Sequence, residues 1–375
     1  MNLRVPAEVF PPGEFLKEEL DARGWSQAEL ADILGRSPRV ISEIISAKRA
    51  ITPETAKGLA AALEGTNPQT WMNLETAYQL SKAKFEEAEV SRRARLYSKF
   101  PVKEMLRRRW VEPSASLEVL EQRFLDFFSI KSMNDTPVFS HMAKKTRYGG
   151  LSVLQIAWLN RAKQIARTIQ VSKYSEAALR RALEEIRHCL QDINSIREVP
   201  SILAKAGVRI VIVEHLPGAK MDGACFWLDD DSPVVALSLR FDRVDNFWHT
   251  LLHELDHVLH GEGKDQPMID VIEGDQVEKN QTMPKEDERA NKAAANFCIS
   301  SQELDKWISS KGRIFSRRNI LAFASQRHVH PGIVVGQLQR RKAIPYSYHR
   351  NLLEKIRPIA VAVCATDGFG KNFGL

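Results

Sequence analysis

The residues with the clearest chemical potential are His253, Glu254 and His257, which form the one His-Glu-x-x-His pattern in the chain. On a helix, side chains four residues apart share a face, so both imidazoles can reach one metal ion. Two histidines at this spacing with a glutamate after the first are the ligands and the general base of zinc-dependent hydrolysis. The pattern predicts that His253 and His257 bind zinc and that Glu254 is the catalytic base. Histidines that only pack inside a helix bundle are the alternative.

A zinc site that catalyses hydrolysis normally has three protein ligands, and water fills the fourth position. The third ligand must therefore come from further along the chain. Residues 285–297 are predicted to form a helix, and three acids stand in its first turn: Glu286, Asp287 and Glu288. Their spacing alone leaves all three open as the ligand.

A small sheet and a helix are predicted to hold the histidines in place. Segments 208–214, 223–228 and 233–239 are rich in β-branched or aromatic residues and are separated by Pro, Gly and Asp, which is typical of short strands. Apolar residues recur at helical spacing from Phe247 to Leu259, and Gly261 predicts the helix end. The expected fold class is α+β. A peptide substrate is expected to add to the edge of the sheet along residues 233–239.

The region from about residue 150 to 340 resembles the ImmA/IrrE metallopeptidase family. Two motifs carry the resemblance: HExxH at 253–257, and Ala290-Asn291, which aligns with a Glu-x-x-Ala-Asn helix of the family. The resemblance implies a zincin-like peptidase domain with zinc as cofactor and Asp287 as third ligand. The family has a glutamate at that position and often a glycine where this chain has Asp256. Because aspartate is one methylene shorter, the two neighbouring glutamates stay open as alternatives.

Residues 14–80 are predicted to form five short helices with clear start and stop signals. Gly24 and Gly35 end the first two, and Ser26 with Glu29 forms a capping box at the start of the second. The last three helices each begin at a proline, at positions 38, 53 and 68. Two short helices joined by a glycine turn are the helix-turn-helix layout.

In this layout the third helix, with Ser37 as its predicted cap, enters the major groove of DNA. Short polar and basic side chains suit base edges and phosphates. The residues predicted to contact DNA are Gln27, Ser37, Arg39, Val40, Ser42, Glu43, Lys48 and Arg49. A helical bundle with a solvated face is the alternative, because the charge of this segment is almost balanced.

Four stretches of the same segment resemble the DNA-binding domain of HigA-type antitoxins, within the Xre and phage-repressor group. They are residues 12–20, 24–31, 51–56 and 71–74, the last of which reads Trp-Met-Asn-Leu. The resemblance covers about residues 10–80. It implies a five-helix fold, usually a homodimer, that binds an operator in double-stranded DNA, and a toxin or repressor protein as partner or substrate.

Length and composition limit the interpretation. The 375 residues predict several domains, which we place at 10–80 (helix-turn-helix), 81–149 (basic helical linker), 150–342 (metallopeptidase) and 343–375 (C-terminal tail). The basic run in the linker suits either a solvated helix face or a second surface for phosphates. A net charge of +7 permits a polyanionic partner without requiring one. Four scattered cysteines, and no apolar stretch of the roughly 18 residues that a membrane span needs, favour a cytoplasmic protein without a membrane partner.

Two functions follow from these patterns. In the first, a DNA-binding regulator carries a zinc peptidase that cleaves a regulatory partner or the chain itself. In the second, the protein is a DNA-binding antitoxin or repressor whose zincin-like domain only binds a partner or senses a signal.

Overall fold

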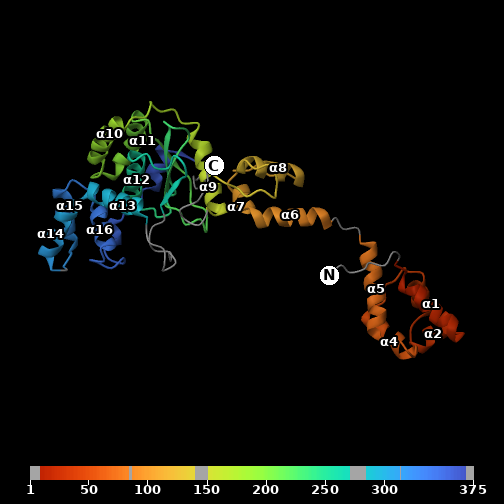
Figure 1. Ribbon diagram of the computed structural model, residues 1–375. Helices are drawn as coiled ribbons and strands as arrows, with labels where there is room; N and C mark the ends of the chain where they lie inside the picture. The colour runs from red at the N-terminus through yellow and green to blue at the C-terminus, as the bar shows by residue number, and fades with distance from the viewer. Residues whose placement is uncertain (1–8, 84–86, 140–150, 271–283, 313, 369–375) are drawn as a thin grey trace. The chain divides into compact units, whose positions relative to one another are not determined.

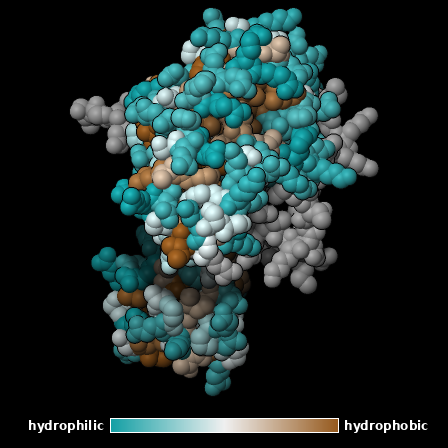
Figure 2. Space-filling model, turned by 90° about the vertical axis from the view of Figure 1, so that its left-hand side faces the viewer, coloured by the Kyte–Doolittle hydropathy of each residue, from teal (hydrophilic) through white to brown (hydrophobic). Residues whose placement is uncertain are grey.

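The computed structural model describes residues 9–83, 87–139, 151–270, 284–312 and 314–368 (Figure 1). The chain forms two compact units, residues Met1–Val90 and Ser91–Leu375. The face in Figure 2 is mainly hydrophilic, with hydrophobic residues scattered between the polar ones. In the part of the chain that the structure describes, no helix is long and apolar enough to cross a membrane.

The first unit consists of the five helices that the sequence predicts. They are α1 (Pro12–Arg23), α2 (Gln27–Ile33), α3 (Pro38–Ile45), α4 (Pro53–Ala62) and α5 (Pro68–Lys82). Their apolar faces meet in one core, in which Leu16, Leu30, Ile41, Leu59 and Trp71 are almost fully buried. Burial of this core, rather than helix propensity, is what stabilises helices as short as these.

The predicted helix starts are confirmed in all but one detail. Ser26 and Glu29 form the reciprocal capping box of α2, and Gly24 ends α1 in a left-handed conformation, with φ 67°. Ser37 occupies the N-cap position of α3, but its side chain makes no cap hydrogen bond. The predicted Ser37 side-chain cap is therefore wrong. Pro38 fixes the first turn of α3, which lowers the need for a capping side chain.

The second unit is built on a five-stranded sheet with the order β4-β2-β3-β1-β5. Its strands are β1 (Arg209–Ile212), β2 (Gly223–Trp227), β3 (Pro233–Leu237), β4 (Met268–Asp270) and β5 (Ala365–Thr366). β1 runs parallel to β3 and to β5, whereas β2 runs antiparallel to β3 and to β4. The three strands predicted from the sequence are confirmed, and β4 and β5 are additions.

Helices cover both faces of this sheet (Figure 1). Side chains alternate between faces along a strand: Ile210 and Ile212 join the core beneath α12, whereas Val211 joins the core beneath α9. Burial on both faces explains why the strands read as continuous apolar runs. The helical elements of this unit are α6 (Glu87–Lys99), α7 (Val102–Arg107), α8 (Leu117–Phe128), α9 (Val153–Ala166), α10 (Glu176–Cys189), η1 (Ile193–Glu198), α11 (Val199–Lys205), α12 (Val244–Leu259), α13 (Lys285–Cys298), α14 (Ser301–Lys311), α15 (Arg317–Gln326), α16 (Pro331–Arg340), η2 (Arg350–Leu352) and α17 (Arg357–Val363).

The prediction that a peptide adds to the sheet along residues 233–239 is wrong, because β3 is not an edge strand. β3 lies between β2 and β1 and pairs with both, so the backbone groups along residues 233–237 are already used. An added strand needs unpaired N–H and C=O groups. Among the described strands, only β4 and β5 stand at the edges of the sheet.

The described residues of the predicted linker from Ser91 onward, and those of the predicted C-terminal tail, lie in the second unit. In the basic segment, the apolar residues between the charges, such as Leu96 and Phe100, are buried in the core below α9. Near the C-terminus, β5 pairs with β1, and the buried Asp367 accepts a hydrogen bond from Trp110 Nε1 at 3.3 Å. Strand β5 therefore completes the sheet, a long-range contact that no local pattern in the sequence indicates.

Several basic side chains of the segment predicted as a linker form ion pairs or hydrogen bonds with other residues of the second unit. Arg92 forms an ion pair with Glu121 at 2.5 Å. Lys99 Nζ donates to the carbonyl of Met133 at 2.7 Å, and the buried Arg108 donates to that of Glu214 at 2.7 Å. These contacts occupy charges that a second phosphate-binding surface would need.

Candidate functional site

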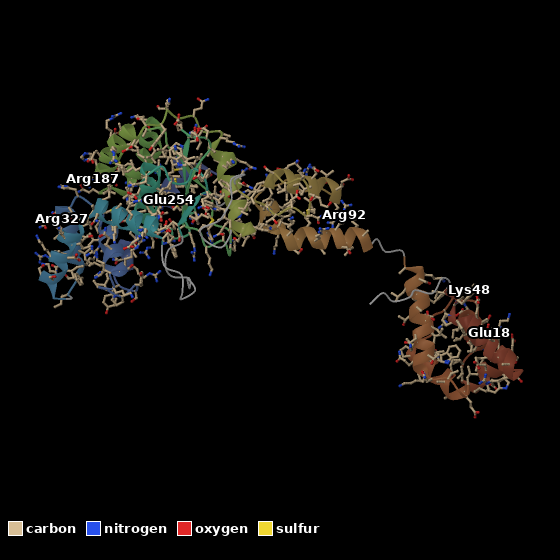
Figure 3. All side chains as sticks on the ribbon, in the orientation of Figure 1. Glu18, Lys48, Arg92, Arg187, Glu254 and Arg327 are labelled. Carbon is tan, nitrogen blue, oxygen red and sulfur yellow. The ribbon has the colours of Figure 1, made fainter. Side chains whose placement is uncertain are left out.

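Helix α12 carries the histidine pair through the interior of the second unit. Its apolar side, including Phe247, Leu251 and Leu255, is buried in the core on one face of the sheet. His253, Glu254 and His257 are buried as well, because α13, α16 and strand β2 pack around the helix. Charged side chains such as Arg187 lie at the surface, whereas Glu254 lies inside (Figure 3).

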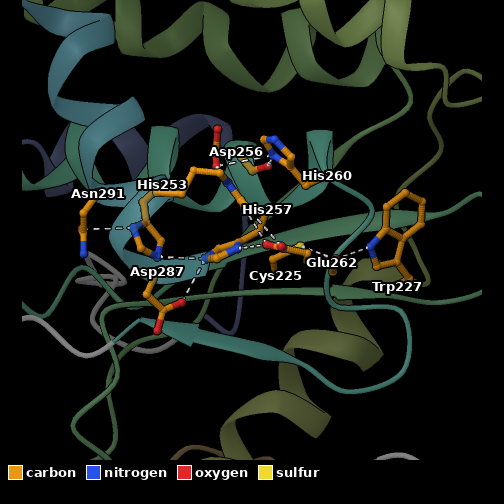
Figure 4. A network of polar contacts seen from close by, with 10 residues as sticks. Cys225, Trp227, His253, Asp256, His257, His260, Glu262, Asp287 and Asn291 are labelled. Atoms are coloured by element: carbon orange, nitrogen blue, oxygen red, sulfur yellow. Dashed lines mark hydrogen bonds and ion pairs between the residues drawn. The ribbon is translucent and has the colours of Figure 1, made fainter. Parts of the chain in front are cut away.

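The two imidazoles converge on one point. His253 Nε2 and His257 Nε2 are 3.0 Å apart, and Asp287 Oδ1, from the first turn of α13, is 3.4 Å from His257 Nε2 (Figure 4). Candidate ligand atoms of the three residues all lie within 4.8 Å of one another. Zinc bonds of 2.0–2.2 Å place tetrahedral ligand atoms about 3.3–3.6 Å apart. The spacing therefore fits a small tetrahedral ion.

Outer partners fix how each imidazole is presented. His253 Nδ1 lies 3.2 Å from Asn291 Oδ1, and His257 Nδ1 lies 2.6 Å from Glu262 Oε2 (Figure 4). Each Nδ1 then donates its hydrogen, which leaves the Nε2 lone pair available to a metal. A carboxylate or carbonyl behind each histidine is the usual support of a zinc ligand.

A charged residue supports this outer layer in turn. Arg289 donates to both carboxylate oxygens of Glu262, at 3.0 and 2.8 Å, and its Nε donates to Asp256 at 2.9 Å. Burial raises the pKa of Glu262, but hydrogen bonds from Arg289 and His257 outweigh it and lower that pKa to about 2. Glu262 is therefore ionised at neutral pH and can accept from His257.

The histidines differ in basicity. Burial, followed by the proximity of His257, lowers the pKa of His253 to about 4, so its imidazole is neutral at pH 7. Burial also lowers the pKa of His257, but hydrogen bonds to Asp287 and Glu262 outweigh it and leave the pKa raised. A metal ion at Nε2 replaces the proton that these two carboxylates would otherwise favour.

Glu254 lies beside the histidine pair without a polar partner. Neither of its carboxylate oxygens has a hydrogen-bond partner among the described residues. Burial, with further contributions from Asp270 and Asp287, raises its pKa well above the usual value. Gly223 of β2 makes room for it, since a Cβ there would stand 2.7 Å from Glu254 Oε1.

The structure separates the three acids that the sequence left open as third ligand. Asp287 is 9% exposed and turns toward His257. Glu288 is exposed and pairs with Lys292 at 2.5 Å. Neither Glu286 nor Glu288 joins the group of candidate ligand atoms found in the described part of the chain. Of the three, the fold brings Asp287 to the histidines.

Sequence reasoning did not find the outer partners. Asn291 stands four residues after Asp287, so helical spacing could have placed both on one face of α13. Glu262, just after the end of α12, contacts Arg289 of α13. Strand β4 brings Asp270 close to Glu254 and His253. No local spacing predicts those meetings.

The second candidate site is the outer face of α3 in the first unit. Of the residues predicted to contact DNA, Val40 and Glu43 are partly buried, and the others are exposed: Gln27, Ser37, Arg39, Ser42, Lys48 and Arg49. Lys48 lies at the surface of this unit (Figure 3). The turn before α3 contains Gly35, with φ 62°, which ends α2 and redirects the chain. The predicted face is therefore open to a partner.

Glu43 connects two arginines on this face. Its two carboxylate oxygens accept from Arg39 Nε and Arg49 Nε, each at 2.8 Å. Glu43 therefore orients basic side chains, a role that the sequence pattern did not indicate.

Comparison with known proteins bears on the first unit. A family model described as helix-turn-helix matches residues 16–71. The uncharacterized HTH-type transcriptional regulator YddM of Escherichia coli K12 is 36% identical over 23% of this chain and 88% of its own length. Virulence-associated protein I of Dichelobacter nodosus is 40% identical over 21% of this chain and 74% of its own length.

Among solved structures, an addiction module antidote protein of a HigA family from Coxiella burnetii is 37% identical. The match covers 20% of this chain and 80% of that chain, with a TM-score of 0.19. The match of the family model to residues 16–71 shows that the first unit is a helix-turn-helix domain. Through this domain the chain belongs to the family of helix-turn-helix transcriptional regulators.

Proposed function

We propose that the protein is a DNA-binding transcriptional regulator of the antitoxin or repressor type, whose second unit is a zincin-like, zinc-dependent peptidase. The DNA-binding part is supported by the exposed face of α3 within a helix-turn-helix domain. The zinc part is supported by one observation above all: both histidines turn Nε2 to a common point while their Nδ1 atoms face acceptors.

On DNA, α3 lies in the major groove and the exposed Arg39 approaches base edges. Its Nε donates to Glu43, and the side chain is 86% exposed, which leaves the guanidinium open to a partner. Lys48, one turn beyond α3, meets phosphate. A homodimer places two such helices about one helical turn of DNA apart, so the operator is palindromic.

In the second unit, His253, His257 and Asp287 would hold zinc, which would supply Lewis-acid chemistry by polarising a carbonyl and lowering the pKa of water. Glu254 takes the proton from the attacking water at a carboxylate oxygen and passes it to the nitrogen of the leaving amine. Its lack of a competing hydrogen-bond partner among the described residues suits a group that must accept and release a proton. The substrate is a peptide of a regulatory partner, such as a toxin or repressor, or of this chain.

A peptide reaches this centre most directly along β4. That strand is at the edge of the sheet, and its last residue, Asp270, offers a carboxylate within 4.8 Å of ligand atoms of His253 and Glu254. Backbone pairing with an edge strand is a general mode of peptide recognition.

A second candidate function is a zinc-dependent sensing or partner-binding module without hydrolysis. The enclosure of the centre favours it: His253 is 1% exposed, and Glu254 and His257 are 0% exposed. A catalytic site has to admit water and a peptide, whereas a structural or sensing site does not.

DNA binding is tested by selecting bound duplexes from a random-sequence library with the full-length protein, while sedimentation measures its oligomeric state. We expect a palindromic consensus and a dimer. Enrichment of no sequence at all contradicts the operator proposal, and a monomer on a single half-site contradicts the dimer.

The zinc peptidase is tested by metal analysis and by hydrolysis of labelled casein, together with a gel assay for cleavage of the chain itself. We expect about one zinc per chain, loss of zinc in His253→Ala and Asp287→Ala, and retention in Glu288→Ala. Glu254→Gln should keep zinc and lose hydrolysis, because the base is gone while the ligands stay. Wild-type protein that binds zinc but cleaves neither substrate supports the sensing module. Wild-type protein that binds no zinc contradicts both the zinc peptidase and the zinc-dependent sensing module.

A further inference from the structure

Asp270 is a buried acid whose role is not explained by the three-ligand site. It is the last residue of β4, where its backbone pairs with Gly223 of β2, and its carbonyl accepts from Asp222 N–H at 2.9 Å. The side chain is buried, and its Oδ2 has no hydrogen-bond partner among the described residues. A buried carboxylate oxygen without a partner is costly unless a cation or a hydrogen-bond donor comes to it.

This carboxylate lies beside the proposed zinc centre. Candidate ligand atoms of His253, Glu254 and Asp270 lie within 4.8 Å of one another, a second group that shares His253 with the first. Glu254, also fully buried, has both carboxylate oxygens without a partner on the described residues. Two buried acids without hydrogen-bond partners among the described residues therefore border the same histidine.

Charge argues for a cation here. The charges that act on Asp270 include the positive one of Arg340 and the negative one of Asp287. Glu254, Asp270 and Asp287 together bring up to three negative charges to one buried region, and both histidines are neutral when they ligate a metal. A divalent ion offsets most of this charge, more effectively the closer all the acids approach it.

We propose that Asp270 is a fourth protein ligand of the ion, so that the resting protein holds zinc with His253, His257, Asp287 and Asp270. This inference rests on the proposed zinc centre. Candidate ligand atoms of His253 and Asp270 lie within 4.8 Å of each other, which exceeds a tetrahedral edge by at most about 1.2–1.5 Å. Rotation of the Asp270 side chain can bring its carboxylate to an ion that His253 holds. Asp270 Oδ2 has no hydrogen bond to another described residue that would prevent this rotation.

The consequence concerns access to the ion. Four protein ligands make a closed site, in agreement with the near-complete burial of the two histidines. Water or a peptide then reaches the metal only as a fifth ligand or by displacing Asp270. Because Asp270 ends the edge strand of the sheet, a peptide that pairs with β4 approaches this ligand first.

The test uses full-length protein, with zinc affinity measured by chelator competition and coordination reported by the absorption spectrum of bound Co²⁺. We expect Asp270→Asn to weaken zinc binding at least about tenfold and to change the Co²⁺ spectrum. Glu288→Gln, which alters an exposed acid of α13, should leave both unchanged. An Asp270→Asn protein with wild-type affinity and an unchanged spectrum overturns the inference.

Asp270→Cys gives a second readout that does not depend on loss of binding. A thiolate at position 270 that reaches the ion produces a charge-transfer band with Co²⁺ in the near ultraviolet, and wild-type protein controls for the native cysteines. Absence of the band while Co²⁺ is bound overturns the inference and leaves the three-ligand centre standing. If wild-type protein binds neither ion, the zinc centre itself fails, and the role of Asp270 fails with it.

Discussion

We expect Glu262→Ala to weaken zinc binding without unfolding the second unit, because Glu262 supports a ligand without being one. Its Oε2 lies 2.6 Å from His257 Nδ1, and Arg289 holds both of its carboxylate oxygens. Removing the carboxylate lets the imidazole rotate and deprives its Nδ1 hydrogen of an ionised acceptor. The ring then presents Nε2 less often and as a weaker base.

The size of the effect follows from which contacts each variant removes. Glu262→Gln keeps an oxygen for His257 but loses the charge and the paired bonds with Arg289, so we expect about a tenfold loss of zinc affinity, or about 1.4 kcal/mol. Glu262→Ala removes the acceptor entirely, and we expect a loss approaching a hundredfold, or about 2.7 kcal/mol.

Chelator competition at fixed pH and ionic strength measures these affinities, and circular dichroism checks that the fold is intact. Glu303→Gln is the matched control, because Glu303 also pairs with an arginine, Arg327, but at the surface of α14 and α15. Equal zinc affinity in wild type, Glu262→Gln and Glu262→Ala would refute the idea that the outer acceptors present the histidines.

Three further predictions address both units. Gly223→Ala should keep zinc but lose Glu254-dependent hydrolysis, since the new Cβ would meet Thr250 Cγ2 at 2.6 Å and Glu254 Oε1 at 2.7 Å; unchanged casein hydrolysis would contradict it. Gly13→Ala should destabilise the first unit by about 1–3 kcal/mol, because its Cβ would stand 2.3 Å from a backbone oxygen of α3; thermal unfolding measures this, with Glu18→Ala as the control on the exposed side of α1. Arg39→Ala should cost about 1–3 kcal/mol on the selected operator alone, whereas Lys48→Ala should weaken binding to all sequences and flatten the salt dependence. Identical salt slopes and operator preference in both variants would remove the assignment of α3 to the groove.

The sequence by itself determined the features that depend on neighbours within about one helical turn. Capping residues, prolines and glycines predicted the five helices of the first unit, and β-branched runs predicted β1, β2 and β3. The spacing of His253 and His257 required that both share a face of whatever helix carries them, and α12 carries them so. Each of these features is local, because capping, turn geometry and i,i+4 proximity involve residues only a few positions apart.

Only the tertiary structure decided which distant groups meet the histidines. The spacing of Glu286, Asp287 and Glu288 does not distinguish them, and only the resemblance favoured Asp287. The way α13 packs on α12 turns Asp287 inward and leaves Glu288 paired with Lys292. The same holds for Glu262 behind His257 and for Asp270 at the end of β4, an edge strand too short to stand out from the acidic segment around it. The physical reason is that packing fixes the rotation of each helix and the order of the strands through contacts between residues far apart in the chain, and the spacing of residues along one segment carries no record of those contacts.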